Sequence, residues 1–300
     1  MMTFAFGIHR FVLSFLVVCL LTPSLWSAPP DDGPSTMNVM TWNIRYDNRG
    51  DGENAWTHRK DWVADIIRRE QVDIVGLQEV LKHQLDDLTQ RLPELAAYGV
   101  GRDDGNTKGE YSPILYRKDR FEVLDKSTFW LSKTPDQAGS RDWDSAITRI
   151  ASWLKLKDRR TGQVFYAINT HFDHMGNEAR ANSAALLVKM LREKFKDHPV
   201  VLTGDFNTKP ESVPYKTLTD RDPPNVPSFY DALAISEAKP QGPDSTWNGF
   251  DSIVPGQRID FLFVTGSFYV RKHRTLDDQK DGRFPSDHLP VTALIEFVLP

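Results

Sequence analysis

A carboxylate and an amide stand two residues apart directly after a short apolar run in the second half of the sequence. The run begins at Val200 and ends at Gly204, and Asp205 and Asn207 follow it. Because alternate residues of an extended segment point to the same side, we expect Asp205 and Asn207 to face one site together. Such a pair suits a hard cation or a polarised water. Gly-Asp also begins many ordinary turns, so the pair alone is weak support for a site.

Similar polar groups accompany other apolar runs along the chain. They are Asn43, Glu79, His171, Asp260 and the neighbours Asp287 and His288. One polar strand end would be unremarkable. Several ends that share Asn, Asp, Glu and His predict a site in a crevice beyond the edge of a sheet.

The oxygen-bearing residues of this set predict a metal site. Glu79 and Asp287, helped by Asn43, offer the ligands that Mg²⁺, Mn²⁺ or Ca²⁺ prefer. Arg149 and Arg45 could each hold an anion with a bidentate guanidinium fork. The combination favours chemistry on a phosphate group.

The two histidines are candidates for proton transfer near neutral pH. These are His171 and His288, and a carboxylate beside each imidazole would fix its tautomer and raise its basicity. Glu110 and Asp260 are the candidate partners. Metal, two histidine–acid pairs and arginine together fit the transfer of a phosphoryl group to water.

The elements that must position these residues alternate between hairpins and strand–helix–strand units. Hydrophobic periodicity predicts strands at 37–44, 72–80, 112–116, 121–131, 148–157, 164–170, 199–204, 258–265 and 289–298. It predicts helices at 60–70, 81–92, 177–196 and 212–218. No internal repeat is visible. This order favours a layered α/β sandwich in one domain.

Composition and the N-terminal sequence further limit the class of protein and its location. The chain has 300 residues with a net charge of −4, which gives no electrostatic case for a dedicated nucleic-acid or membrane binder. Residues 1–28 match a signal peptide, because Arg10 precedes an apolar run and small residues follow. An uncleaved anchor and a lipid anchor on Cys19 are the alternatives.

Two segments follow the predicted signal peptide. Residues 29–36 form a disordered lead-in, and residues 37–300 form the domain. Cleavage removes the only cysteine, Cys19, so the mature protein has no disulfide, thiolate metal site or cysteine nucleophile. It would also leave no membrane span, and we expect a secreted or periplasmic protein.

Six short motifs occur in the order seen in the endonuclease/exonuclease/phosphatase superfamily, which the chain resembles from residue 37 to its end. The motifs are Thr41–Trp42–Asn43–Ile44–Arg45, Leu77–Gln78–Glu79–Val80, Asn169–Thr170–His171, Gly204–Asp205–Phe206–Asn207, Arg258–Ile259–Asp260 and Ser286–Asp287–His288. Each is weak alone, but six in one order are specific. The chain is similar to pancreatic-type deoxyribonucleases and AP endonucleases, and looks closest to secreted bacterial members. The resemblance implies a four-layered α/β sandwich, with two mixed sheets between helices and the site at one rim.

The resemblance also implies roles for individual residues. It gives Mg²⁺ binding to Glu79 with Asn43 and Asp287 close by, and it places His171 and His288 on either side of the scissile phosphate. It further implies that Asp260 supports His288, that Glu110 supports His171 and that Arg149 binds phosphate. It also implies that Asn207 contacts a phosphate oxygen or the attacking water, and that Asp205 is a second metal or base site.

These observations predict a secreted, metal-dependent phosphoesterase whose partner is a phosphate-ester substrate. A nuclease acting on nucleic acid, a sugar-phosphate or nucleotide phosphatase, and a sphingomyelinase-like phospholipid hydrolase stay open. No protein partner is indicated. The alternatives from other classes are a catalytically silent ligand-binding module and a retaining glycosidase, which would need carboxylates ~5 Å apart and would leave both histidines idle.

Other conspicuous residues have ordinary interpretations. His58, His83, His198 and His273 stand among charged residues, so we expect them on the surface. Three tryptophans are expected in the core, and they are Trp130, Trp143 and Trp153. The loops at 132–146 and 247–250 are expected to shape the substrate pocket.

Overall fold

The computed structural model describes residues 1–3, 33, 35–222 and 226–298. Contacts separate residues 1–32 from a compact unit formed by residues 33–300, and only this unit is considered further. Most of the predicted signal peptide and most of the lead-in lie outside the described residues. No helix in the described part of the chain is long and apolar enough to cross a membrane.

Two six-stranded sheets form the centre of the unit. The first has the strand order β11-β12-β1-β2-β4-β3, with β1 (Thr36–Asn43), β2 (Ile74–Gln78), β3 (Leu95–Tyr98), β4 (Ile114–Arg117), β11 (Phe268–Thr275) and β12 (Val291–Phe297). The second has the order β5-β6-β7-β8-β10-β9, with β5 (Phe121–Trp130), β6 (Ile150–Asp158), β7 (Val164–His171), β8 (Val200–Asp205), β9 (Phe229–Asp231) and β10 (Asp260–Thr265). Each sheet is mixed, because β1–β2 and β7–β8 run parallel and their other neighbours antiparallel.

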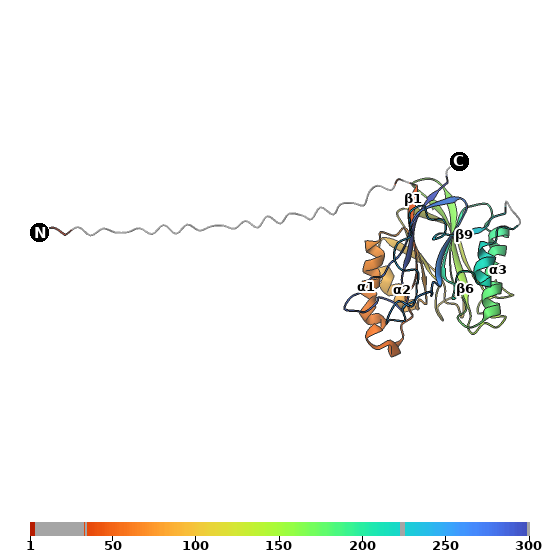
Figure 1. The fold of residues 1–300 in the computed structure, drawn as a ribbon, viewed down its shortest axis with the longest axis horizontal. Coiled ribbons are helices and arrows are strands. Elements are labelled where there is room, and N and C mark those ends of the chain that lie inside the picture. Colours follow the sequence, from red (N-terminus) through yellow and green to blue (C-terminus); the bar gives the residue numbers. More distant parts are fainter. Residues whose placement is uncertain (4–32, 34, 223–225, 299–300) are drawn as a thin grey trace. The chain divides into compact units, whose positions relative to one another are not determined.

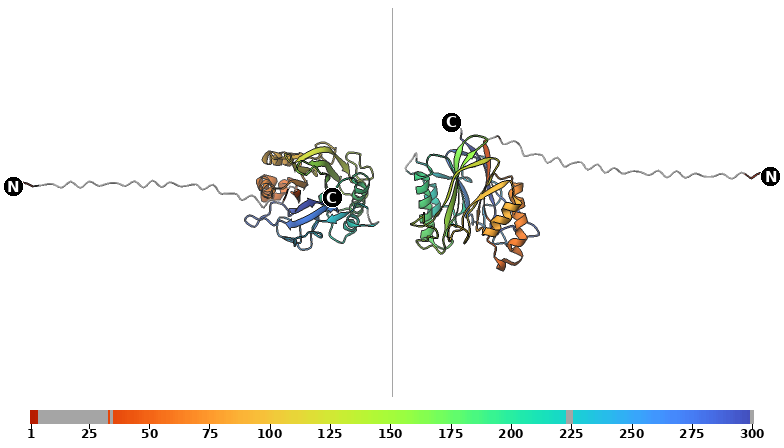
Figure 2. Two further views of the ribbon diagram at one scale, coloured as in Figure 1. Left: turned by 90° about the horizontal axis from the view of Figure 1, so that it is seen from above. Right: turned by 180° about the vertical axis from the view of Figure 1, so that it is seen from behind.

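Helices cover the outer face of each sheet, as Figures 1 and 2 show. The helices α1 (Trp56–Arg69) and α2 (Lys82–Arg91) pack on the first sheet, and α3 (Asn177–Glu193) and α4 (Val213–Thr219) pack on the second. A short 3₁₀ helix, η1 (Arg49–Asn54), precedes α1. Three apolar clusters fill the interfaces between layers, and the middle cluster joins the two sheets. The predicted four-layered α/β sandwich is confirmed.

The sequence patterns missed three strands, β3, β9 and β11, and all three lie at sheet edges. Edge strands are short or carry charge, which hides their periodicity. In β11 a run of basic residues interrupts the apolar alternation, so this strand was not predicted. The prediction that 258–265 and 289–298 are the last two strands is therefore wrong, because β11 lies between them. A bulge between Val270 and Lys272 shifts the alternation and turns His273 inward, where it is 4% exposed. The prediction of a surface His273 is therefore also wrong.

A buried ion pair links the ends of strands from both sheets. Arg120, in the turn after β4, lies 2.8 Å from Asp158 at the end of β6 and 2.9 Å from Asp73 just before β2. The side chains of Arg120 and Asp158 are 1% and 0% exposed. Because both charges are desolvated, loss of Arg120 would leave the Asp158 carboxylate uncompensated in the core, whereas Arg120 would keep Asp73 if Asp158 were lost.

Candidate active site

The strands bring the predicted site residues to one edge of the two sheets. The carboxyl ends of β1 and β2 lie side by side, with Asn43 opposite Gln78, next to Glu79. In the second sheet Asp205 is in register with His171 on β7 and with Asp260 on β10. The amide of Asn43 joins the two sheets, since its Nδ2 donates to Asp205 Oδ2 at 3.0 Å.

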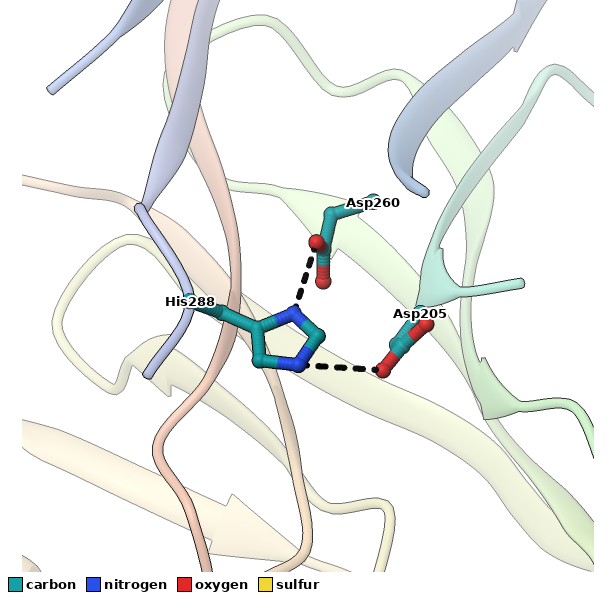
Figure 3. A group of neighbouring side chains, drawn as sticks. All are labelled: Asp205, Asp260 and His288. Atoms are coloured by element: carbon teal, nitrogen blue, oxygen red, sulfur yellow. Dashed lines mark hydrogen bonds and ion pairs between the residues drawn. The ribbon is translucent and has the colours of Figure 1, made fainter. Parts of the chain in front are cut away.

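His288 lies between two carboxylates, as Figure 3 shows. Its Nδ1 is 2.9 Å from Asp260 Oδ2, and its Nε2 is 3.8 Å from Asp205 Oδ2. All three side chains are buried. Burial would lower the pKa of His288, but the charges of Asp260 and Asp205 outweigh it and raise this pKa well above its usual value. The predicted contact between Asp260 and His288 is therefore present.

His171 faces the same carboxylate from the other side. Its Nε2 lies 3.0 Å from Asn207 Nδ2 and 3.3 Å from Asp205 Oδ2. Burial, reinforced by the positive charges of Arg149 and Arg102, lowers the pKa of His171 well below its usual value. The two histidines thus have opposite preferences for charge, and Asp205 contacts both.

The structure places a different acid beside His171 from Glu110, which the sequence predicts. Glu110 hydrogen-bonds Arg102 Nη1 at 2.7 Å, and His171 Nδ1 is buried with no partner among the described residues. The predicted Glu110–His171 pair does not form, and the Glu110 carboxylate accepts from Arg102 instead. The acid that contacts His171 is Asp205.

Glu79 and Asp287, together with the neutral amide of Asn43, form the acidic part of the site. The Asn43 Nδ2 donates to Glu79 Oε1 at 3.0 Å, and the Tyr46 N–H donates to Glu79 Oε2 at 3.1 Å. Glu79, directly after β2, has a φ of 61°, in the left-handed region, which costs backbone strain at a residue of the site. Burial, followed by the charge of Glu79, raises the pKa of Asp287 although nearby cations oppose this.

Arg45 was predicted to bind a substrate anion, but its guanidinium is occupied by carboxylates. It forms two hydrogen bonds with Asp51, and it lies 4.0 Å from Glu79 and 3.9 Å from Asp287. Three negative charges surround it, so it balances the acidic site and is poorly placed to bind a phosphate as well.

The donor set fits a divalent metal ion. The ligand atoms of Asp205, Asp260 and His288 lie within 4.8 Å of one another, and Asp260 Oδ1 is buried with no hydrogen-bond partner in the described part of the chain. Burial and the neighbouring Asp260 raise the pKa of Asp205 to about 7. Such crowding of buried carboxylates favours a nearby cation. Glu79 and Asp287 offer further carboxylate oxygens, which are ligands for Mg²⁺, Mn²⁺ or Ca²⁺.

Arg149, predicted to bind phosphate, lies near His171 together with a second arginine, Arg102, that was not predicted. Arg149 is 5% exposed, and its Nη2 lies 3.2 Å from His174 Nδ1. Arg102 is held by Glu110 in the loop before β4. In the sequence Arg102 precedes two aspartates and a glycine, a pattern typical of a solvated turn, so nothing marked it as a site residue.

Comparison with known proteins identifies the family to which this sandwich belongs. Residues 40–288 match the model of the Endonuclease/Exonuclease/phosphatase family. This match covers well over half of the chain, and the chain belongs to that family.

Three relatives show how the chain is placed within the family. A solved endonuclease/exonuclease/phosphatase from Bacteroides vulgatus is 43% identical, with a TM-score of 0.83 over 88% of this chain and 99% of that one. A mannosyl-6-phosphatase from Bacteroides thetaiotaomicron is 35% identical, with a TM-score of 0.81 over 87% and 100%. Nocturnin of Drosophila melanogaster is 22% identical over 88% of this chain, which spans only 47% of that protein. The chain therefore covers about half the length of this curated relative.

Proposed function

We propose that the protein is a metal-dependent hydrolase of phosphoric esters, and that a phosphomonoester of a sugar or similar small molecule is its substrate. The observation that carries this proposal is the meeting of His171, His288 and Asp260 around Asp205 at the edge where Glu79 stands. A ligand-binding module has no need of two buried histidines on one buried carboxylate. The family contains both nucleases and phosphatases.

The choice of a small phosphomonoester has its own support. The relative named as a mannosyl-6-phosphatase is 35% identical and is covered over its whole length. The relatives named as exoribonucleases are 21% and 22% identical, and this chain spans 51% and 36% of them. The net charge of −4 also gives little attraction for a nucleic acid.

Glu79 and Asp287 would hold the metal ion in this proposal, and Asp205 could hold a second. Asn43, which the sequence predicts as a further ligand, is better placed to orient these carboxylates, because its Nδ2 faces Glu79 and Asp205 and its Oδ1 accepts from the Arg45 N–H. A divalent ion bound there supplies positive charge to the phosphate oxygens. Asn43 fixes the orientation of Glu79 through its hydrogen bond. Mg²⁺ is our first choice, with Mn²⁺ and Ca²⁺ as alternatives.

Proton transfer falls to the residues around Asp205. His288, oriented by Asp260, and His171, oriented by Asn207, lie on either side of this carboxylate. A water activated by one of these groups attacks the phosphorus, and another of them protonates the leaving oxygen. Burial keeps bulk water from competing for these protons.

Export is the other part of the proposal. The basic residue, apolar run and small residues within 1–28 support a cleaved signal peptide and a secreted or periplasmic protein. Cell fractionation tests this directly. Deletion of residues 1–28 should leave the protein in the cytoplasm, and unchanged export of that variant would contradict the proposal.

A substrate panel tests the activity. The mature protein would be assayed on mannose 6-phosphate, p-nitrophenyl phosphate, bis-p-nitrophenyl phosphate, RNA, plasmid DNA and sphingomyelin, with Mg²⁺ or with EDTA. The test variant is Glu79→Gln, and the matched control is Glu122→Gln, whose exposed carboxylate on β5 pairs with Arg159. Turnover of a monoester that needs Mg²⁺ and Glu79 supports the proposal. Turnover of nucleic acid or sphingomyelin alone contradicts the substrate, and no turnover at all favours a binding module.

A further inference from the structure

Two arginines, Arg149 buried and Arg102 partly buried, lie on the His171 side of the site. The side chain of Arg149 is 5% exposed and that of Arg102 is 13% exposed. They come from different segments that the fold joins, since the Trp130 indole donates to the Arg102 carbonyl at 2.7 Å and the Leu131 N–H donates to the Arg149 carbonyl at 2.8 Å. Arg149 directly precedes β6, whose Ala151 pairs with Thr170 next to His171.

The protein supplies fewer acceptors here than the two guanidinium groups have donors. Glu110 accepts from Arg102 Nη1, and Asp103 is 3.8 Å from Arg102 Nε with an exposed carboxylate. The Nε atoms of both arginines are buried with no hydrogen-bond partner among the described residues. Buried donors are normally paired, so such a surplus indicates an anionic ligand.

Asp173 does not remove this surplus. It lies 3.8 Å from Arg149 Nε, but its two oxygens already accept from four backbone N–H groups and from the hydroxyl of Ser145. Its charge is therefore largely satisfied by other donors. Arg149 is held in place by this carboxylate without being fully paired to it.

We propose that Arg102 binds the substrate phosphate together with Arg149, and that this second arginine makes the site prefer phosphomonoesters over phosphodiesters. The inference rests on the proposed function and specifies its substrate class. A monoester has three non-bridging oxygens and, above its second pKa near ~6, about two negative charges. A diester has two such oxygens and one charge. The second guanidinium therefore gains more from a monoester.

The competing role for Arg102 is structural, as a tie between its loop and Glu110. Two variants separate the roles, because Arg102→Gln and Glu110→Gln break the same ion pair. A structural tie would make their effects equal. A phosphate-binding Arg102 makes them opposite, since Glu110→Gln frees the guanidinium and leaves one more uncompensated positive charge near His171. Arg102→Lys keeps the charge and loses the fork, and Arg117→Gln is the control, because Arg117 pairs with Asp119 near the surface at the end of β4.

Calorimetric titration with inorganic phosphate is the primary measurement, because it needs no turnover. We expect Arg102→Gln to weaken phosphate binding by about 10- to 100-fold, and we expect Glu110→Gln and Arg117→Gln to bind at least as tightly as the wild type. In kinetics, Arg102→Gln should lower kcat/KM for p-nitrophenyl phosphate about tenfold more than for bis-p-nitrophenyl phosphate. Arg102→Lys should fall between Arg102→Gln and the wild type and should melt at the wild-type temperature.

Three results would overturn this inference. They are wild-type protein that does not bind phosphate, equal weakening by Arg102→Gln and Glu110→Gln, and equal loss of kcat/KM on both esters. Failure of the proposed function looks different. In that case the wild type would hydrolyse neither ester, while the phosphate titrations would still decide whether Arg102 binds the anion.

Discussion

Replacement of Asp260 by asparagine tests whether the buried His288 transfers a proton. Asp260 Oδ2 lies 2.9 Å from His288 Nδ1, and the Asp260 side chain is 0% exposed. Asparagine has the same shape, but its neutral amide no longer stabilises an imidazolium or fixes its tautomer. General acid–base catalysis contributes about 10²- to 10⁴-fold, so we expect Asp260→Asn to lower kcat by that factor. KM and the dependence on Mg²⁺ should change little if Asp260 acts only through His288, whereas loss of a ligand from the group of Asp205, Asp260 and His288 would also alter the dependence on Mg²⁺.

The control for this prediction comes from the same contact. If Asp260 acts through His288, the double variant Asp260→Asn/His288→Ala should be no slower than His288→Ala alone. The fold should tolerate the change, because Asp260 adds to the repulsion that raises the pKa of Asp205. Steady-state kinetics on the preferred ester and thermal melting give both readouts. A kcat of Asp260→Asn within tenfold of the wild type, at an unchanged melting temperature, would refute proton transfer by an oriented His288.

Three further predictions concern the metal and the core. Glu79→Gln should weaken Mn²⁺ binding roughly tenfold or more in calorimetry, and unchanged affinity would remove Glu79 from the metal site. Arg120→Leu should lower the free energy of unfolding by about 3–5 kcal/mol in urea titrations, because Asp158 is left buried and unpaired, and addition of Asp158→Leu should recover most of the loss. Burial lowers the pKa of His273 to about 4. The unfolded chain therefore takes up this proton first as the pH falls, and stability drops by about 3 kcal/mol between the normal pKa near ~6.5 and pH ~4. His273→Asn should lack that part of the pH dependence, and an unchanged pH–stability curve would contradict the assignment.

The central site residues were predictable because the chemistry coincides with a strong sequence pattern. Asn43, Glu79, His171 and Asp205 each follow an apolar run that becomes a buried strand of the sandwich. Polar residues at the ends of these strands do not pack in the apolar core, so they stand out from the hydrophobic pattern of the sequence. The parallel pairs β1–β2 and β7–β8 then place them at one edge.

The parts that could not be predicted depend on contacts between distant segments. Glu110 and Arg102 lie in an irregular loop, and only the folded structure shows that the carboxylate binds Arg102 and leaves His171 to Asp205. Arg45 likewise resembles a free cation in the sequence, but the turn at Asp51 brings a carboxylate to it. The burial of His273 depends on one bulge in an edge strand, which changes the inward face without a sign in the hydrophobic pattern.

The register of the second sheet is as important to the site as the identity of its residues. Asp205 and Asp260 are directly opposite each other on antiparallel strands. Their side chains therefore lie on the same face of the sheet, with Cβ atoms about 5 Å apart. Like charges at such positions destabilise a sheet, and both side chains are buried. A slip of β10 by one residue would turn Asp260 to the other face and separate it from His288. The apolar side chains of β8 and β10, which pack in the clusters on either face of the sheet, oppose that slip. The core therefore enforces a juxtaposition of acids that costs stability. That juxtaposition brings His288, held by Asp260, to Asp205, while the pairing of β7 with β8 brings His171 to the same carboxylate.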